Sequence, residues 1–157
     1  MTRALLVVAL LAAVPAAARA DDRRWGVSLW GLSYHVNRSV DYNEDNWGLG
    51  VRYYFKPNRL FFEADALRNS NRGLVLPASL GLEFRLAPLP AGCKLSGVVA
   101  LTAAYYQYPN QNRTDVKIGP VPGVTIGCGR VKVNTIAVLR KSSEPLAALS
   151  LSLTIMF

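Results

Sequence analysis

The chain has 157 residues, of which 51% are hydrophobic and 18% are charged, and its formal net charge is +8 at pH 7. This length corresponds to one domain, and the apolar excess is unusual for a water-soluble protein of this size. The basic charge comes with no nucleic-acid-binding motif, so we expect no nucleic-acid partner.

Residues 1–20, MTRALLVVALLAAVPAAARA, predict a signal peptide for export. An arginine precedes an apolar run, and the run is followed by Ala-Arg-Ala ending at Ala20, which fits a cleavage site. The run is too short for a membrane-spanning helix, which needs about 20 consecutive apolar residues, and no later segment supplies them. We therefore predict an exported mature domain, residues 21–157, without a transmembrane helix.

From Trp25 onward, apolar residues alternate with small or polar ones, which is the pattern of strands with two different faces. In WGLGVRYYF, residues 47–55, the odd positions are apolar or aromatic and the even positions hold glycine, arginine or tyrosine. In LWGLSYHV, the same reading puts Trp30 on the apolar face and His35 on the other. No segment predicts a helix. The alternation predicts eight strands, at about residues 25–36, 46–56, 59–68, 78–87, 93–106, 120–128, 130–140 and 147–157.

The predicted connections alternate between short turns and mostly long, polar loops. An even number of strands with short turns at one end and long loops at the other is typical of a bacterial outer-membrane β-barrel. A secreted β-sandwich or a lipocalin-like barrel, with its apolar face inward, is the alternative. The C-terminal Phe157 and the aromatic residues beside the apolar faces favour the first reading. The predicted fold is an eight-stranded antiparallel transmembrane β-barrel of the bacterial outer membrane.

The inward faces of such a barrel differ between its two ends. Charged residues would occupy the half of the lumen beside the short turns: Arg52, Glu63, Asp65, Glu83, Arg85, Lys94 and Lys132. Small or neutral residues would line the other half: Gly31, Ser33, Ser79, Ala100, Thr102, Ala104, Thr125, Ile136, Val138, Ala148 and Ser150. An eight-stranded barrel is either filled by side chains or holds one small ligand. A neutral well above a charged floor would accommodate an acyl chain, and filling by side chains is the alternative.

Two further features concern the sixth strand. Pro120 and Pro122 lack the N–H that a sheet ladder needs, so they predict loose pairing with one neighbour and a lateral gap in the wall, unless a proline-rich loop extends to Gly123. Cys93 and Cys128 would both lie at the short-turn end with the same outward parity, which makes a structural disulfide geometrically reasonable.

The stretch YHVNRSVDYNEDNWGLG, residues 34–50, resembles the first strand and loop of the outer-membrane lipid A palmitoyltransferases, the PagP family. In that family a histidine ends the first strand and Tyr-Asn-Glu precedes Trp-Gly-x-Gly. The segment IGPVPGVTIGCG is similar to the family's proline-containing sixth strand, and the last strand ends in phenylalanine as there. The likeness spans most of the mature chain and is strong from Tyr42 to Gly50.

The resemblance implies an enzyme that moves a palmitoyl chain from a glycerophospholipid to lipid A in the outer leaflet. The family's required histidine and serine correspond to His35 and Ser70, and its aspartate corresponds to Asn69. The family's floor glycine, which sets the acyl-chain length, corresponds to Gly81 and would suit a sixteen-carbon chain. His35 would be the general base, and Ser70 would be a nucleophile or would stabilise the oxyanion.

The chain departs from the family in two places. Asn69 has no carboxylate, so Asp41, Glu44 and Asp45 in the first loop are the candidates to replace it. Only a few residues separate the cleavage site from the first strand, which leaves no room for the family's amphipathic N-terminal helix.

Basic residues of the long loops, among them Arg38, Arg68 and Arg72, predict a cationic rim that would hold the phosphates of lipid A, although a generally solvated loop surface has the same composition. The expected partners are therefore lipid A or lipopolysaccharide, a glycerophospholipid and the outer membrane. We expect a monomer that uses no cofactor and no metal.

Two other functions stay open. The first is a non-catalytic barrel for adhesion or envelope stability, in which Asn69 marks lost activity. The second is a lipid A deacylase, which ranks last because deacylase barrels carry a His-x-Ser pair on a late strand and this chain has none.

Overall fold

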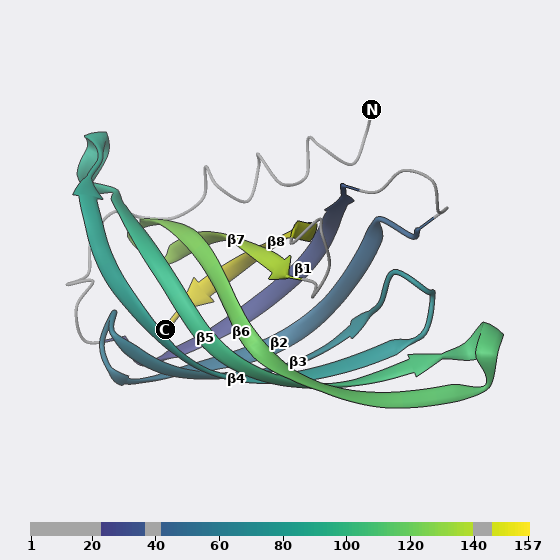
Figure 1. Cartoon of the computed structure of the whole chain (residues 1–157). Helices are drawn as coiled ribbons and strands as arrows, with labels where there is room; N and C mark the ends of the chain where they lie inside the picture. Colours follow the sequence, from purple (N-terminus) through teal and green to yellow (C-terminus); the bar gives the residue numbers. More distant parts are fainter. Residues whose placement is uncertain (1–22, 37–41, 140–145) are drawn as a thin grey trace.

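The computed structural model describes residues 23–36, 42–139 and 146–157, and they form a closed antiparallel barrel. Each strand pairs with the next, and β8 pairs with β1 (Figure 1). The strands are β1 (Trp25–His35), β2 (Asp45–Lys56), β3 (Leu60–Arg68), β4 (Leu74–Pro88), β5 (Lys94–Tyr108), β6 (Arg113–Cys128), β7 (Val131–Leu139) and β8 (Leu146–Met156). The predicted eight-stranded antiparallel β-barrel is confirmed. The predicted signal peptide lies outside the described residues.

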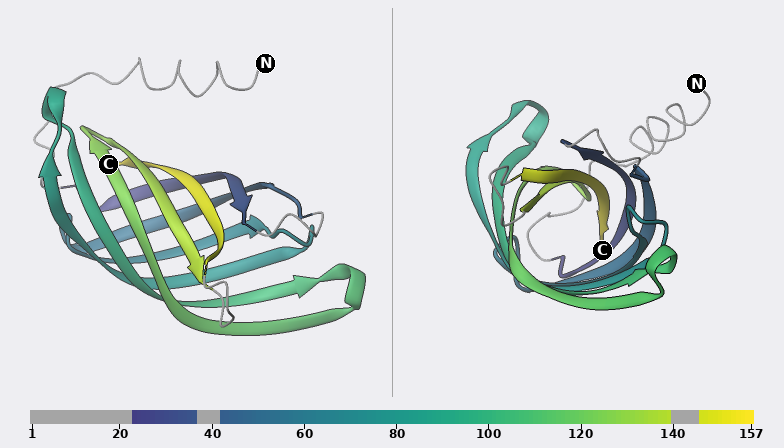
Figure 2. Two further views of the ribbon diagram at one scale, coloured as in Figure 1. Left: turned by 45° about the horizontal axis from the view of Figure 1, so that its top comes forward. Right: turned by 45° about the vertical axis from the view of Figure 1, so that its right-hand side comes forward.

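The two ends of the barrel differ. At the end that we call the short-turn end, compact connections join β2 to β3, β4 to β5 and β6 to β7. The opposite end, the loop end, carries the connections from β1 to β2, β3 to β4, β5 to β6 and β7 to β8. The β5–β6 hairpin extends beyond the other strands at the loop end (Figures 1 and 2).

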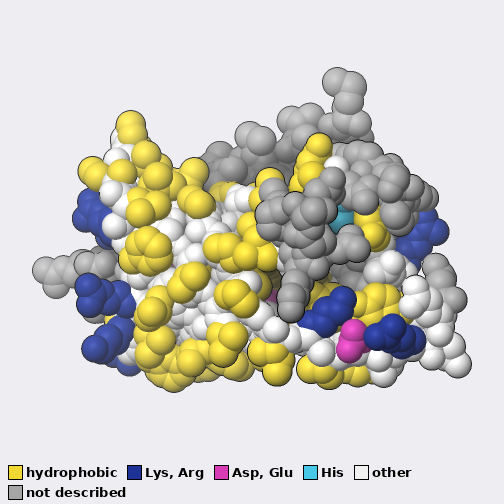
Figure 3. Space-filling view, viewed as in Figure 1, with side chains coloured by type: hydrophobic (Ala, Val, Ile, Leu, Met, Phe, Trp, Pro, Cys, Tyr) yellow, Lys and Arg dark blue, Asp and Glu magenta, His cyan; other side chains and the backbone are white. Residues whose placement is uncertain are grey.

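The outer surface is apolar and the inner surface is largely polar, as the alternation predicts. On β2, Trp47 is 66% exposed on the outside, whereas Tyr54 is fully buried in the interior. Large apolar side chains of this kind are exposed on every strand. In Figure 3, hydrophobic side chains cover the middle of the visible face, and lysine and arginine gather toward its ends.

On β1 and β4, the side chains of Trp30 and Arg85 lie differently from the prediction. The register of β1 shifts between Trp30 and Leu32, so Trp30 points inward like Ser28 while Ser33 and His35 keep their predicted inward direction. The irregularity at Gly31 reverses the parity of the strand, as an inserted residue does. Arg85 was expected in the lumen but is exposed, because it lies close to the open short-turn end, where a long side chain reaches solvent.

Strands β4 and β6 begin earlier than predicted, because their prolines interrupt pairing on one side only. Pro77 pairs with Ala104 of β5 and lies where the register between β3 and β4 is interrupted. Pro120 and Pro122 pair with β5, whereas β6 pairs with β7 only from Gly123 onward. The alternative of a loop reaching Gly123 is therefore wrong. The ladder between β6 and β7 is open over the loop-end part of β6.

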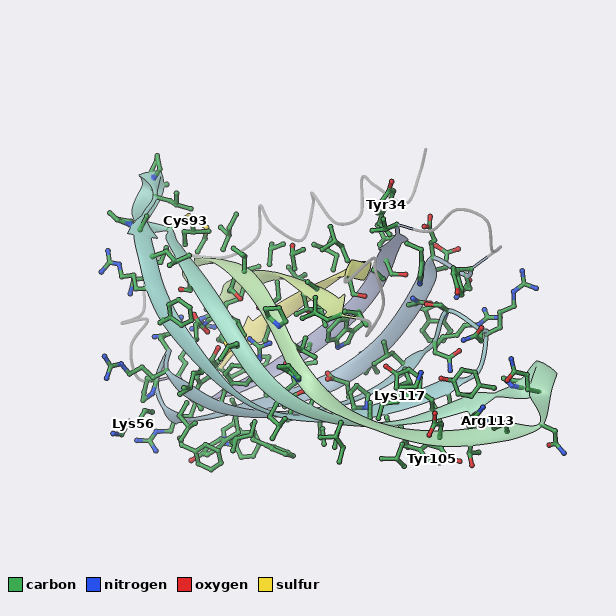
Figure 4. All side chains as sticks on the ribbon, viewed as in Figure 1. Tyr34, Lys56, Cys93, Tyr105, Arg113 and Lys117 are labelled. Atoms are coloured by element: carbon green, nitrogen blue, oxygen red, sulfur yellow. A yellow bond between two sulfur atoms is a disulfide. The ribbon has the colours of Figure 1, made fainter. Side chains whose placement is uncertain are left out.

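A disulfide joins Cys93, just before β5, to Cys128 at the end of β6. It fastens two neighbouring strands at the short-turn end (Figure 4). The only helical elements in the described part of the chain are two 3-10 turns, Pro90–Gly92 and Pro109–Gln111. Within those residues there is no helix with the length and apolar character needed to span a bilayer.

Candidate functional site

A cavity of about 590 Å³ occupies the part of the barrel toward the loop end, and all eight strands contribute to its lining. This volume lies in the range of small-molecule pockets. The wall from β4 to β8 carries mostly small and apolar side chains: Val75, Pro77, Ser79, Val98, Ala100, Thr102, Ala104, Val121, Ile136, Val138, Ala148 and Ser150. Larger side chains line its loop-end part: Tyr106, Tyr108, Lys117 and Leu139. The wall from β1 to β3 carries Trp30, Glu63 and Asp65, and Trp30 Nε1 donates to Asp65 Oδ1 over 2.8 Å.

Phe61 closes the lower end of the cavity together with Arg52. The Arg52 guanidinium carbon lies 4.6 Å from the centroid of the Phe61 ring. Gly81, the predicted floor glycine, is the register partner of Phe61 and is buried, but it is not among the cavity-lining residues. The Phe61 ring covers Gly81 and forms the floor in its place.

Below this floor, the interior is a layer of paired charges and hydrogen-bonded amides. Arg52 Nη2 donates to Glu63 Oε2 over 2.7 Å, and Lys132 Nζ donates to Glu83 Oε2 over 2.8 Å. The carboxamide of Asn134 contacts Thr125, Ser152 and Thr154, so Thr125 belongs to this layer and not to the upper well where it was expected. Because each of these charges is paired with an opposite charge, its burial avoids the cost of an unpaired buried charge. The layer leaves the cavity as a well that is closed toward the short-turn end.

His35 lies at the end of β1, lines the mouth of the cavity and is 8% exposed. Its ring stacks on Tyr42, with ring centroids 4.5 Å apart. Glu44 Oε1 accepts a hydrogen bond from the backbone N–H of His35 over 3.1 Å and lies 3.8 Å from His35 Nδ1. Of the three loop carboxylates considered from the sequence, Asp41 lies outside the described residues and Asp45 is exposed. Among the described residues of this loop, Glu44 is therefore the carboxylate that lies beside His35.

Ser70 also lines the cavity mouth, and Asn46 connects it to β1. One terminal atom of the Asn46 carboxamide lies 2.6 Å from Ser33 Oγ and 3.3 Å from Ser70 Oγ. The backbone of the two loops is joined as well, because Asn43 N donates to Ser70 O over 2.9 Å. The β1–β2 and β3–β4 connections therefore hold His35 and Ser70 at the same mouth.

Asn69 organises the β3–β4 turn. Its Nδ2 donates to Gln107 O over 2.7 Å and to Leu74 O over 3.3 Å, while its Oδ1 accepts from the N–H groups of Asn71 and Gly73. Both ends of the amide are thus engaged, and the side chain is buried. Asn69 is a structural residue of the turn that carries Ser70, which differs from its expected place in the catalytic set.

The predicted cationic rim is present in part. Arg68 and Lys117 line the mouth, and Lys117 Nζ lies 5.1 Å from the ring centroid of Tyr106 and 5.5 Å from that of Tyr108. Lys117 projects from β6 of the long hairpin, which has Arg113 near its tip (Figure 4). Arg72 is exposed in the β3–β4 turn with φ of 64°, and Arg38 lies outside the described residues.

Besides Trp30, Asn46 and Phe61 contribute to the site without having been predicted from the sequence. No sequence pattern marks Asn46 as a site residue, because its contacts depend on how two loops meet. Phe61 was recognisable in principle, since it has the same parity as Glu63 and Asp65 and therefore faces the lumen.

No protein-family profile matches this chain, and no curated protein matches it either. In the described ranges, no group of three or more histidine, cysteine, aspartate and glutamate side chains could hold a metal ion. The fold and the site define a small closed barrel with a blind well. The side chains that could take part in a reaction, among them His35, Glu44 and Ser70, lie at the mouth of this well.

Proposed function

We propose that this protein is an acyltransferase of the bacterial outer membrane, which moves an acyl chain from a glycerophospholipid to lipid A. The observation that carries the proposal is the blind, mostly apolar well with His35, Glu44 and Ser70 at its mouth. A closed well suits one linear chain, and the residues at its mouth suit transfer of an ester. The resemblance of residues 34–50 to the lipid A palmitoyltransferases suggests palmitoyl as the chain.

The outer surface supports the proposed placement in a membrane. Residues such as Leu49, Leu101 and Ile118 are 60%, 60% and 71% exposed, which favours burial in lipid over contact with water. The rings of Trp25 and Tyr53 lie 4.7 Å apart, and those of Tyr53 and Phe55 lie 5.3 Å apart, near the short-turn end. Clustered aromatic residues near the end of an apolar belt suit a membrane–water interface.

The opening between β6 and β7 supplies an entrance for the chain. It begins above Gly123, and Val121 and Val138 of the two strands line the well at this level. Because Pro120 and Pro122 keep pairing with β5, their missing N–H groups face the side of β7, where they leave the ladder open. A phospholipid tail in the surrounding leaflet would pass through this opening, and its ester would remain at the mouth.

The chemistry that we assign to the mouth is a direct transfer. His35 Nε2 accepts the proton of a lipid A hydroxyl, whose oxygen forms a new ester bond to the acyl carbonyl carbon. The bond between that carbon and the glycerol oxygen breaks, and the imidazolium returns the proton to the leaving oxygen, which gives a lysophospholipid. Ser70 Oγ donates to the carbonyl oxygen as negative charge develops there. Glu44 on the Nδ1 side orients the ring and stabilises its protonated form, so Glu44 is a positioning residue.

The test uses the purified barrel, a phospholipid with one deuterated palmitoyl chain and lipid A as the acceptor. Mass spectrometry should find lipid A with one labelled chain and an equal amount of lysophospholipid. Labelled free fatty acid without labelled lipid A would define a hydrolase instead. If neither product forms while circular dichroism shows a folded barrel, the proposed transfer is wrong.

A further inference from the structure

The floor of the well contains one aromatic side chain, which lies beside the guanidinium of Arg52. Phe61 of β3 is 1% exposed, and its ring centroid lies 5.6 Å from that of Tyr54. Arg52 lies over the same ring and pairs with Glu63 in the polar layer below. Phe61 therefore stands where the apolar well meets the charged layer, so the end of any chain in the well would reach its ring first.

On the neighbouring strand β4, the residue opposite Phe61 is a glycine, which has no side chain. Gly81 is the register partner of Phe61, and a Cβ atom at position 81 would collide with Phe61 Cζ, lie 2.7 Å from Phe61 Cε1 and lie 3.0 Å from Ala100 Cβ. The ring thus occupies the space that a side chain at position 81 would need. Gly81 makes room for the ring, and the ring ends the well.

We propose that Phe61 is the specificity-determining residue that limits the length of the linear acyl chain in the well. The inference rests on the acyl-chain well of the proposed function and names the residue that measures the chain. Non-bonded carbon atoms pack at about 3.5 Å, so the ring takes up roughly that depth. With C–C bonds of about 1.5 Å, an extended chain advances about 1.3 Å per methylene. The ring therefore shortens the accepted chain by about two to three carbons relative to a floor of bare backbone at Gly81.

The experiment measures binding, so that it does not depend on catalysis. The folded protein is prepared in a bile-salt detergent, whose rigid ring system competes poorly for a linear well. Lysophosphatidylcholines with saturated chains of 10 to 18 carbons are added, and the dissociation constant is measured for each chain. In the wild type, affinity should rise with each added carbon up to one length and then level off or fall.

Four variants locate that limit. Phe61→Ala should move the limit to chains about two to three carbons longer, and Phe61→Leu should move it less. Phe62→Ala is the matched control, because Phe62 is the adjacent residue and is exposed on the outer face. The double variant Phe61→Ala with Gly81→Met should bring the limit back toward that of the wild type, because the new side chain fills the same space from β4.

The outcomes separate the two proposals. An unchanged limit in folded Phe61→Ala and Phe61→Leu, or an equal change in Phe62→Ala, would overturn the role of Phe61. If Phe61→Ala does not fold, the chain-length limits of Phe61→Leu and of the double variant still test the role of Phe61. A wild type that binds chains with a sharp limit but transfers none to lipid A would contradict the acyltransferase and leave Phe61 as the limit of a binding well. A wild type that binds these chains without any dependence on their length would overturn the role of Phe61, and a wild type that binds none of them would contradict both proposals.

Discussion

Of the three loop carboxylates that the sequence offers as candidates, Glu44 lies beside His35 in the structure. Glu44 Oε1 holds the backbone N–H of His35 and lies on the Nδ1 side of its ring, while Tyr42 stacks on the ring. These contacts restrict both the position and the orientation of the imidazole. In the proposed transfer, a base fixed in this way needs no carboxylate at position 69.

The first prediction concerns this pair. His35→Ala should lower kcat by about 10²- to 10⁴-fold, which is the usual contribution of a positioned general base. Glu44→Gln keeps an oxygen for the His35 N–H but removes the charge, so we expect kcat to fall by about 10- to 100-fold, part of that contribution, with KM for the phospholipid unchanged. Asp45→Asn is the matched control, since Asp45 is exposed on β2. Equal activity of Glu44→Gln and Asp45→Asn would remove Glu44 from the mechanism.

Asn69 gives the second prediction. An aspartate at this position could not donate to Gln107 O and Leu74 O, and it would place a charge beside these carbonyl oxygens. Leaving a buried polar group unsatisfied costs about 1–3 kcal/mol. We expect Asn69→Asp to lower the free energy of unfolding by about 2 kcal/mol, measured by denaturant titration, and Asn71→Asp to change it less. A variant Asn69→Asp that is equally stable and transfers acyl chains faster would show that position 69 acts as a catalytic carboxylate.

At the residue scale, the alternation along each strand predicts which side chains face the interior and which face outward. Tyr54 and Arg52 face inward as the alternation of β2 requires, since one buried face fixes the register of a strand. Trp30 was placed on the wrong face, because alternation cannot reveal an irregularity at Gly31 that reverses it. The roles of Glu44 and Asn69 depend on contacts between loops, which local pattern does not encode.

At the scale of the elements, the prolines of β6 determine where the barrel wall is open. All eight strands are predicted by the alternation, but β4 begins at Leu74 and β6 at Arg113, earlier than the predicted starts at about residues 78 and 120. In the structure Pro77, Pro120 and Pro122 lie within strands, at positions where one neighbouring ladder is interrupted. A proline is compatible with a strand wherever its missing N–H faces no partner.

The third prediction follows from this opening. The double variant Pro120→Thr with Pro122→Val supplies two N–H donors on the side of β7, so the ladder can extend toward Leu139. Hydrogen exchange should slow in residues 136–139, and transfer should fall about 3- to 10-fold because a gating step is restricted. Pro88→Ala, at the exposed end of β4, is the control. Slower exchange with full activity would mean that the chain enters by another route.

At the scale of the whole molecule, the barrel has three layers along its axis. The loop end holds the polar mouth, the middle holds the well, and the part toward the short-turn end holds the ion pairs Arg52–Glu63 and Lys132–Glu83. The charged floor and the small lining above it were both anticipated from the inward-facing residues. Whether the space inside that lining is hollow or filled by side chains stays open at the level of the sequence, because it depends on packing across the barrel.

The layered interior gives the fourth prediction. Paired charges and hydrogen-bonded amides close the lumen, so the protein inserted in a planar lipid bilayer should show no steady ion conductance. Insertion itself is verified by protection of the strands from protease added to the bilayer vesicles. A stable, ohmic current carried by the wild type would contradict the blind well.

The most direct test of the account is the mass of lipid A from cells that contain the wild-type protein, the His35→Ala variant or neither. We expect a gain of one acyl chain with the wild type, and no gain with His35→Ala although equal amounts of folded barrel are present in the outer membrane. An unchanged lipid A mass with the wild type, in cells whose outer leaflet contains phospholipid, would contradict the acyltransferase and favour a barrel without catalytic activity.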